Sequence, residues 1–574
     1  MTRGRDPIQL EIVRHALVGI AGEMKVTLVR CAYNPIIFEA YDFSTGVFDP
    51  DGRLAAQAAG LPIFLGTLDW AVQAVVDKYA DGGFLEGDVY LSNDPYEGGG
   101  THLNDVSVIT PAFSGGQLIG FAASRAHWTD VGGAAPLSVQ TDAREIHGEG
   151  LLLPVIRLRR GGVENREVAD VLRANIRPVG RMEGDLRAQL AAASVGCRRM
   201  AALARRTGPE RLVRLIREYQ DRSAHRVALA LRRLPDFEAA AEDSLDDDGI
   251  GGPPAAARVC VRKQGEHLVV DFTGTDAANP SGYNCSLCGL VSAIRVIFKA
   301  LVDPESAPDD GSFRALRVIA PEGSFISAVR PTAVSIYGEP ARRAIDAVWR
   351  AFSAVLGERV PAGHYGTIAG LAMAGTDDRS ANPQEVSYQG PNAGGWGASA
   401  AGDGESALCS ITNGDTRNTP AELIEHTVPL RVCRYELRPD SCGAGRYRGG
   451  LGLLYEFEVL TAAGFALTSA LGRTATGTFG AAGGGHGACT GLELRRDGRL
   501  VAKPARATAT PLRRGDRVLL RTGGGGGFGP AAERSPEAVR RDLTAEYITE
   551  KWARQHHPAA LAATEPALDE GGHP

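Results

Sequence analysis

The first 30 residues place hydrophobic side chains three and four positions apart, which is the spacing of an α-helix with one buried face. The helix is expected to begin at Asp6-Pro7, because proline is favoured in the first helical turn. The positions that define the predicted buried stripe are Ile8, Ile12, Val13, Ala16, Leu17, Ile20, Met24 and Leu28.

Alternating hydrophobic and polar positions predict two β-hairpins after this helix. In the first, residues 41–57 alternate around the turn Asp49-Pro50-Asp51-Gly52. In the second, residues 106–113 and 117–126 are joined by Ser114-Gly115-Gly116, and glycines of this kind favour tight hairpin turns.

Beyond the hairpins, the chain is predicted to mix helical and strand-forming segments. Helical spacing occurs at residues 68–79, 290–301 and, as two or three Ala-, Arg- and Leu-rich helices, 175–234. Strand patterns occur at residues 88–91, 151–158, 258–274 and, as short strands with glycine turns, 431–521. The acidic stretch 242–248 with the Gly- and Pro-rich stretch 249–254 marks a change in composition and a boundary.

These patterns predict an α+β fold of several domains, with mixed α/β N-terminal and middle regions and a β-rich C-terminal module. The expected divisions are residues 1–240, which carry the candidate metal site, 241–430, 431–530 and 531–574. The last of these is charged and Ala-rich, and predicts a peripheral helix and a frayed tail.

Composition excludes several classes of protein. The chain has 574 residues with 62 Lys and Arg against 68 Asp and Glu, a net charge of −6 that argues against a nucleic-acid partner. No stretch approaches the ~18 apolar residues of a membrane span, and the start lacks the apolar core of a secretion signal. Nine cysteines, an odd number, suit reduced thiols, so we expect a cytoplasmic protein.

Glycine is enriched, at 72 residues of 574, where about 7% is average. The run Gly524-Gly525-Gly526-Gly527-Phe528-Gly529 formally fits a dinucleotide-binding motif, but in a pure glycine run a flexible loop is the preferred interpretation. The sequence also has no phosphate-binding P-loop.

The second hairpin brings candidate metal ligands together. Antiparallel pairing about its turn sets partners whose numbers sum to about 230, so residues 101–105 should lie beside residues 125–130. Two imidazoles and two carboxylates, those of His102, Asp105, His127 and Asp130, would then meet at one rim of the sheet. Mixed nitrogen and oxygen ligands suit Zn²⁺, Mn²⁺ or Fe²⁺.

Two further candidates follow this hairpin in the sequence. His147 is a third possible imidazole ligand, and Glu149 beside it could serve as a base. The alternative is that all these residues are separate loop positions, with histidines capping backbone groups and aspartates making turns.

Several motifs together resemble those of the hydantoinase B/oxoprolinase family, over about residues 6–530. They are Asn93-Asp94-Pro95-Tyr96, residues 99–105, Ala126-His127 with Asp130-Val131-Gly132-Gly133, Glu149-Gly150, Gly184-Asp185-Leu186, Asp271-Phe272-Thr273-Gly274-Thr275, Asn418-Thr419-Pro420-Ala421-Glu422 and residues 435–453. The resemblance implies the metal-containing subunit of an ATP-dependent enzyme that opens cyclic amides, or of a related acetone-type carboxylase.

The resemblance also implies partners and residue roles. ATP would be bound by a separate hydantoinase A-type subunit, giving a hetero-oligomer that acts on a small cyclic amide. His127, Asp130 and His147 would hold a divalent metal, and Asp105 or Glu149 would take a proton from the attacking water. The alternatives are a carboxylase subunit and a non-catalytic scaffold.

One position departs from the family pattern. The family commonly has a second histidine directly after the first in its A-H-x-x-D motif, whereas this chain has Trp128. If that histidine binds metal or substrate, its replacement would change the specificity or leave the site dependent on His102.

Overall fold

A seven-stranded antiparallel sheet forms the N-terminal part of the computed structural model, which describes residues 7–390, 392–414 and 416–563. Its strand order is β2-β1-β5-β4-β3-β6-β7. The strands are β1 (Phe43–Phe48), β2 (Leu54–Gln57), β3 (Val89–Ser92), β4 (Asp105–Ser114), β5 (Gln117–His127), β6 (Ile156–Arg160) and β7 (Val163–Glu164). The helices of this part are α1 (Pro7–Cys31), α2 (Pro35–Phe38), α3 (Pro62–Leu65), α4 (Leu68–Tyr79), α5 (Ile146–Glu149), α6 (Arg166–Asn175), α7 (Val179–Thr207) and α8 (Pro209–Arg232).

Helices cover both faces of this sheet. Helices α1 and α7 pack on one face, where Val47 of β1 is buried, and α4 packs on the other, where Phe48 is buried. Because neighbouring strand residues point to opposite faces, a sheet covered on both sides buries every position of its inner strands. All six residues of β1 are accordingly buried.

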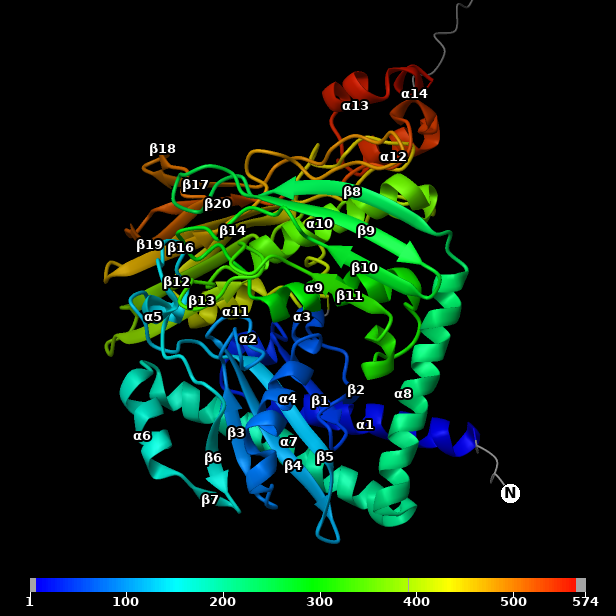
Figure 1. Ribbon diagram of the computed structural model, residues 1–574. Coiled ribbons are helices and arrows are strands. Elements are labelled where there is room, and N and C mark those ends of the chain that lie inside the picture. The colour runs from blue at the N-terminus through cyan, green and yellow to red at the C-terminus, as the bar shows by residue number, and fades with distance from the viewer. Residues whose placement is uncertain (1–6, 391, 415, 564–574) are drawn as a thin grey trace, which may run out of the picture.

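The predicted N-terminal helix is confirmed as α1, but its buried stripe begins later than expected. Leu17, Met24 and other members of the stripe are buried. Ile8 and Ile12, however, are 71% and 58% exposed, because the first turns of α1 extend beyond the body of the molecule (Figure 1).

Both predicted hairpins are confirmed, β1 with β2 and β4 with β5. In the second, Gly115 and Gly116 make the turn with φ values of 60° and 79°, conformations that glycine adopts at little cost. At the other end, Asp105 pairs with His127. This pairing joins the two motifs that carry the candidate ligands.

Three smaller sheets form the rest of the chain. They have the orders β11-β10-β9-β8, β13-β12-β16-β19 and β14-β15-β20-β17-β18. Their strands are β8 (Phe237–Ser244), β9 (Ala256–Gln264), β10 (His267–Asp271), β11 (Leu316–Ile319), β12 (Gly370–Asp377), β13 (Gln384–Gly390), β14 (Leu430–Leu437), β15 (Leu453–Val459), β16 (Phe465–Ala470), β17 (Gly491–Arg496), β18 (Arg499–Ala502), β19 (Arg506–Leu512) and β20 (Arg517–Arg521). The helices are α9 (Leu287–Val302), α10 (Gly338–Leu356), α11 (Ala421–Thr427), α12 (Pro536–Thr544), α13 (Glu550–His556) and α14 (Pro558–Ala562).

The helices and strands confirm an α+β fold in which the two halves of the chain are stacked. Helix α8 runs along the side of the molecule from the N-terminal part to the strands β8 to β10, and α10 packs against α9, β8 and β9 (Figure 1). One sheet joins β12 and β13 to β16 and β19, so strands on both sides of residue 430 belong together. The domain boundaries stay a prediction.

One predicted strand begins later than expected. The strand expected at residues 151–158 begins only at Ile156, because the Asn93 side chain holds Leu153 instead, accepting a hydrogen bond from its N–H at 2.6 Å. In the acidic stretch 242–248, Glu242 and Asp243 lie in β8 and pair with β9.

The glycine run near residue 525 is not a flexible loop. Residues 522–529 are all buried, and Gly525, Gly526 and Gly527 donate backbone hydrogen bonds of 2.9–3.0 Å to Gly450, Gly363 and Gly485. A Cβ atom at Gly525 would lie 1.9 Å from the carbonyl oxygen of Trp396. The run is backbone packed directly on backbone, which only glycine permits.

The C-terminal region forms the predicted peripheral structure as three short helices, α12 to α14, at one end of the molecule (Figure 1). Val539, Ile548 and Leu561 pack there with Cys442 and Leu451. The predicted frayed tail at residues 564–574 lies outside the described residues. Over the residues that the structure describes, no helix has the length and apolar character to cross a membrane.

Candidate functional site

A cluster of two histidines and one aspartate lies at the end of the β4–β5 hairpin. Asp105 opens β4, His127 closes β5, and His102 lies in the loop that leads into β4. Oδ1 of Asp105 is 3.1 Å from Nε2 of His102 and 3.1 Å from Nδ1 of His127, and the two imidazole nitrogens are 3.2 Å apart. The structure thus brings together three of the predicted site residues in a group that could hold a metal ion.

The chemistry of this group fits a cation. Nδ1 of His102 lies 3.0 Å from the carbonyl oxygen of Ser335, which can only accept, so this nitrogen carries a proton. Nε2 therefore presents a lone pair to Asp105 unless the ring is charged. Burial lowers the pKa of His102, but the Asp105 carboxylate outweighs it and raises the pKa to about 8. A bound divalent ion would replace that proton.

Both oxygens of the Asp105 carboxylate contact residues of this site. Its Oδ2 accepts a hydrogen bond from the Thr101 hydroxyl, and its Oδ1 faces both imidazoles. Burial would raise its pKa, but the two histidines hold the pKa well below its usual range. Asp105 is therefore ionised and available to a metal, but both its oxygens already have partners.

Asp42 is a further acidic member of the site that the sequence did not reveal. It directly precedes β1, which pairs with β5, and its carbonyl accepts a hydrogen bond from His127 N. Within the described part of the chain, Oδ1 of Asp42 and Nε2 of His127 are buried without a hydrogen-bond partner. Burial raises the pKa of Asp42 to about 6. These two open atoms could bind a metal or accept a proton from substrate.

Glu149 and His102 both contact the backbone of Ser335. Oε1 of Glu149 accepts a hydrogen bond of 2.7 Å from the N–H of Ser335, whose carbonyl accepts from the His102 ring. Burial raises the pKa of Glu149 to about 8, so the carboxyl is largely protonated at neutral pH. Glu149 is placed to orient His102 through the backbone of Ser335.

Asp130 is not part of the cluster in this structure. Its Oδ1 accepts from Gly132 N at 2.7 Å, and its Oδ2 accepts from Leu137 N at 2.8 Å and lies 2.9 Å from the Arg177 guanidinium. The carboxylate therefore organises the loop after β5. Its role as a metal ligand stays a prediction from the family motif.

His147 also lies apart from the cluster. It is an exposed residue of α5 and is not among the residues whose ligand atoms gather around Asp105. Its assignment as a ligand likewise stays a prediction.

Trp128 lies in the hydrophobic core, with its Nε1 donating a hydrogen bond of 2.8 Å to Oε1 of Gln189 on α7. Neighbouring residues at a strand end point to opposite sides, so Trp128 faces α7 while His127 faces the cluster.

We expect Trp128→Phe to lower the free energy of unfolding by about 1–3 kcal/mol, because it leaves the Gln189 oxygen buried and unpaired. Metal content, measured by elemental analysis, should stay at the wild-type level; its loss would show that the indole supports the site directly.

The cluster opens into a cavity of about 120 Å³ whose walls come from distant parts of the sequence. Asp42, His102 and His127 line one side of it. The remaining lining residues are Ile36, Leu61, Ile63, Phe64, Val139, Ser335, Ile336, Tyr337, Gly338, Glu339, Arg342, Ile368, Gly370, Leu371, Ala372, Gln389, Gly390, Thr412, Asn413, Thr468 and Ala470. Most of these walls are apolar, and a small set of polar groups converges on the space, which is the usual composition of a small-molecule site.

The chain thus has an α+β fold, and the cavity with its His and Asp residues is a candidate metal-assisted active site. Comparison with known proteins gives the family. Residues 6–531 match the model of the hydantoinase B/oxoprolinase family, and the chain belongs to that family. The caprolactamase subunit beta of Pseudomonas jessenii is 31% identical over 572 residues, covering 97% of this chain and 96% of the relative.

Solved structures agree with this assignment. The crystal structure of ATP-dependent caprolactamase from Pseudomonas jessenii matches with a TM-score of 0.89 and 29% identity, over 98% of this chain and 99% of the other. A nucleotide-free acetone carboxylase structure matches with a TM-score of 0.88 over 96% of this chain and 79% of the other. At 20% identity, the second similarity shows the fold alone.

Proposed function

We propose that this protein is the metal-binding catalytic subunit of an ATP-dependent cyclic-amide hydrolase of the hydantoinase, 5-oxoprolinase or lactamase type. The observation that carries the proposal is the cluster of His102, Asp105 and His127 at the wall of a largely apolar cavity. Such a cavity suits the hydrocarbon part of a small ring, and the cluster provides the polar end at which an amide could react.

The residues of the site would have three roles, which are metal binding, proton acceptance and orientation of the His102 ring. His102, Asp105 and His127 would hold a Zn²⁺, Mn²⁺ or Fe²⁺ ion, which when bound supplies Lewis-acid polarisation of the amide carbonyl. Asp42 would accept a proton from the attacking water at its open Oδ1. We prefer Asp42 to Asp105 as the base because both oxygens of Asp105 already have partners. Glu149 would keep the His102 ring in its orientation.

ATP would enter through a hydantoinase A-type partner subunit. The relative from Pseudomonas jessenii is named as a subunit beta, and the related structure is of an ATP-dependent enzyme. Activation by ATP is chemically useful because amide resonance makes direct ring opening slow. The net reaction would consume the cyclic amide, two water molecules and ATP and give the ring-opened acid, ADP and phosphate. We place this hetero-oligomer in the cytoplasm, a location that the nine free cysteines support.

A carboxylase is the second candidate, supported by the acetone carboxylase fold. The third candidate is a non-catalytic scaffold; against it, Trp128 packs in the core and leaves the group of His102, Asp105 and His127 free to hold a metal.

The test is a reconstitution of the chain with a hydantoinase A-type subunit. We expect ATP-dependent ring opening of a hydantoin or lactam panel, measured as ADP release and as a mass gain of one water in the product. Bicarbonate dependence with a carboxylated product would identify the carboxylase instead. Absence of both activities in a complex that carries stoichiometric metal would contradict the proposal.

A further inference from the structure

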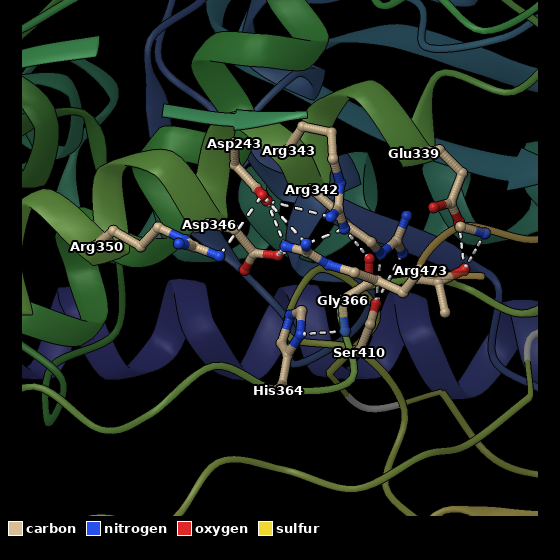
Figure 2. A network of polar contacts seen from close by, with 12 residues as sticks. Asp243, Glu339, Arg342, Arg343, Asp346, Arg350, His364, Gly366, Ser410 and Arg473 are labelled. Atoms are coloured by element: carbon tan, nitrogen blue, oxygen red, sulfur yellow. Dashed lines mark hydrogen bonds and ion pairs between the residues drawn. The ribbon is translucent and has the colours of Figure 1, made fainter. Parts of the chain in front are cut away.

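The cavity contains a buried arginine that lacks a counter-ion. Arg342, on α10, is 1% exposed and lines the same cavity as His102 and His127. Its guanidinium donates only to neutral oxygens, those of Gly338, Ser410, Thr412 and Asn413 (Figure 2 labels Arg342 and Ser410). Over the described residues, no carboxylate oxygen lies within 4.0 Å of the Arg342 guanidinium, so Arg342 forms no ion pair.

The other buried arginines show how unusual this is. Arg343, Arg448, Arg473 and Arg534 each pair with at least one aspartate. Arg125 shares the absence of a carboxylate partner within the described chain, but it is not among the residues that line the cavity, and its charge lies over the Phe64 ring. Among the buried arginines of the described chain, Arg342 is thus the one that lines the ligand cavity without an ion-pair partner.

The acid nearest in sequence forms no ion pair with Arg342. Glu339 lies one helical turn earlier and also lines the cavity, but its Oε1 accepts hydrogen bonds from the Thr367 hydroxyl at 2.7 Å and from Ile368 N at 2.9 Å, and within the described chain its Oε2 is buried without a hydrogen-bond partner. A buried charge without a counter-ion is costly, and the cost falls when an anion binds beside it. Binding of an anionic group beside Arg342 would therefore be favourable in this cavity.

The position of Arg342 relates this anion site to the metal cluster. The ring of Tyr337, which lies directly before α10, is 5.1 Å from the His102 ring between centroids. Arg342 follows five residues later, but its guanidinium reaches back one helical turn and donates to the carbonyl of Gly338, the residue next to Tyr337. The anion site and the cluster therefore lie near the same end of α10, and a small ring with one substituent can contact both, with its carbons on the apolar walls.

We propose that Arg342 is a specificity-determining residue that binds an anionic oxygen group on the substrate, so that the preferred substrate is a cyclic amide bearing a carboxylate. The inference rests on the proposed function for the identity of the amide end of the ligand. A carboxylate on the ring and a phosphoryl group on an activated ring share this anionic chemistry. Guanidinium groups bind both by charge-assisted hydrogen bonds.

A matched pair of ligands tests the proposal without any mutation. 5-Oxoproline and 2-pyrrolidinone share the lactam ring and differ only in the carboxylate. We expect the purified chain, supplied with Zn²⁺, to bind 5-oxoproline at least about tenfold more tightly in ligand-observed NMR titrations. Equal affinity for the two, with no binding of inorganic phosphate, would overturn the proposal.

Variants then assign the preference to Arg342. Arg342→Gln should abolish the preference for 5-oxoproline and leave 2-pyrrolidinone binding unchanged, and Arg342→Lys should restore part of it if the glutamine variant does not fold. Arg262→Gln, at an exposed pair with Glu238, is the control and should keep the full preference. A preference that persists in a folded Arg342→Gln protein would overturn the assignment.

Two further measurements distinguish a carboxylate from a phosphoryl group at this site, and failure of the Arg342 proposal from failure of the proposed function. Inorganic phosphate that displaces 5-oxoproline and binds more tightly, in an Arg342-dependent way, would assign the site to a phosphoryl group. If the reconstituted enzyme opens neutral lactams while the purified chain shows no anion preference, the Arg342 proposal fails and the function stands. If an Arg342-dependent preference exists but no ring is opened, the proposed function fails and the anion site stands.

Discussion

Replacement of Asp105 by asparagine is expected to remove the metal and almost all turnover. Asparagine keeps the shape of the side chain, but it removes the negative charge that lies 3.1 Å from both imidazoles. We expect metal affinity to fall by about 100-fold or more and turnover of the reconstituted enzyme to fall on the order of 10²–10³-fold. The measurements are elemental analysis after dialysis and product formation under saturating ATP.

Asp130→Asn is the matched control for this variant. Because Asp130 is held by Gly132, Leu137 and Arg177, we expect its amide variant to keep the metal and to lose only modest stability. The reverse result, with metal lost from Asp130→Asn and kept in Asp105→Asn, would support the motif-based assignment and contradict the cluster seen in the structure.

The largest effect on stability is expected at a buried charge network far from the cluster in sequence. Arg473 donates to Asp243 of β8 and, at 2.6 Å, to Asp346 of α10, and Arg343 pairs with the same two aspartates (Figure 2). The side chains of all four are at most 6% exposed. The network therefore ties a strand, a helix and the segment after β16 to one another.

We expect Arg473→Met to lower the free energy of unfolding by about 3–5 kcal/mol, because it leaves buried aspartates short of one positive charge. Urea unfolding followed by both circular dichroism and tryptophan fluorescence measures the change, since two probes reveal whether the chain unfolds in a single transition. Arg262→Gln, which breaks an exposed pair, should cost at most about 1 kcal/mol. Equal losses for the two variants would show that the network contributes no more than a surface pair.

Local sequence patterns were sufficient to predict the hairpin that carries the site. The Ser114-Gly115-Gly116 turn sets the register to within one residue, a shift between Ala112 and Phe113 completes it, and Asp105 then pairs with His127. The α+β class followed from similarly local periodicities in α1, α4 and α9. Prediction succeeded where the interactions that determine the structure lie within one hairpin or one helix.

Pairings between distant segments could not be predicted from such patterns. Asp42 reaches His127 only because β1 pairs with β5, and no turn connects those two strands directly. Arg342 lines the cavity because the start of α10 lies beside His102, more than 200 residues away in sequence. Asp130 was selected by its spacing from His127, but spacing does not reveal that Arg177 and two backbone N–H groups would occupy its carboxylate.

The packed glycine run has a consequence for how mutations in this chain should be interpreted. Every change at the first or second base of a glycine codon introduces a side chain or a stop. At Gly524, Gly525 and Gly526 the first side-chain atom would fall within about 2 Å of a carbonyl oxygen, at 1.8, 1.9 and 2.0 Å. Loss-of-function substitutions would therefore concentrate in this run although it contains no catalytic group. An invariant glycine motif here would record a limit on backbone spacing and would not indicate a nucleotide site.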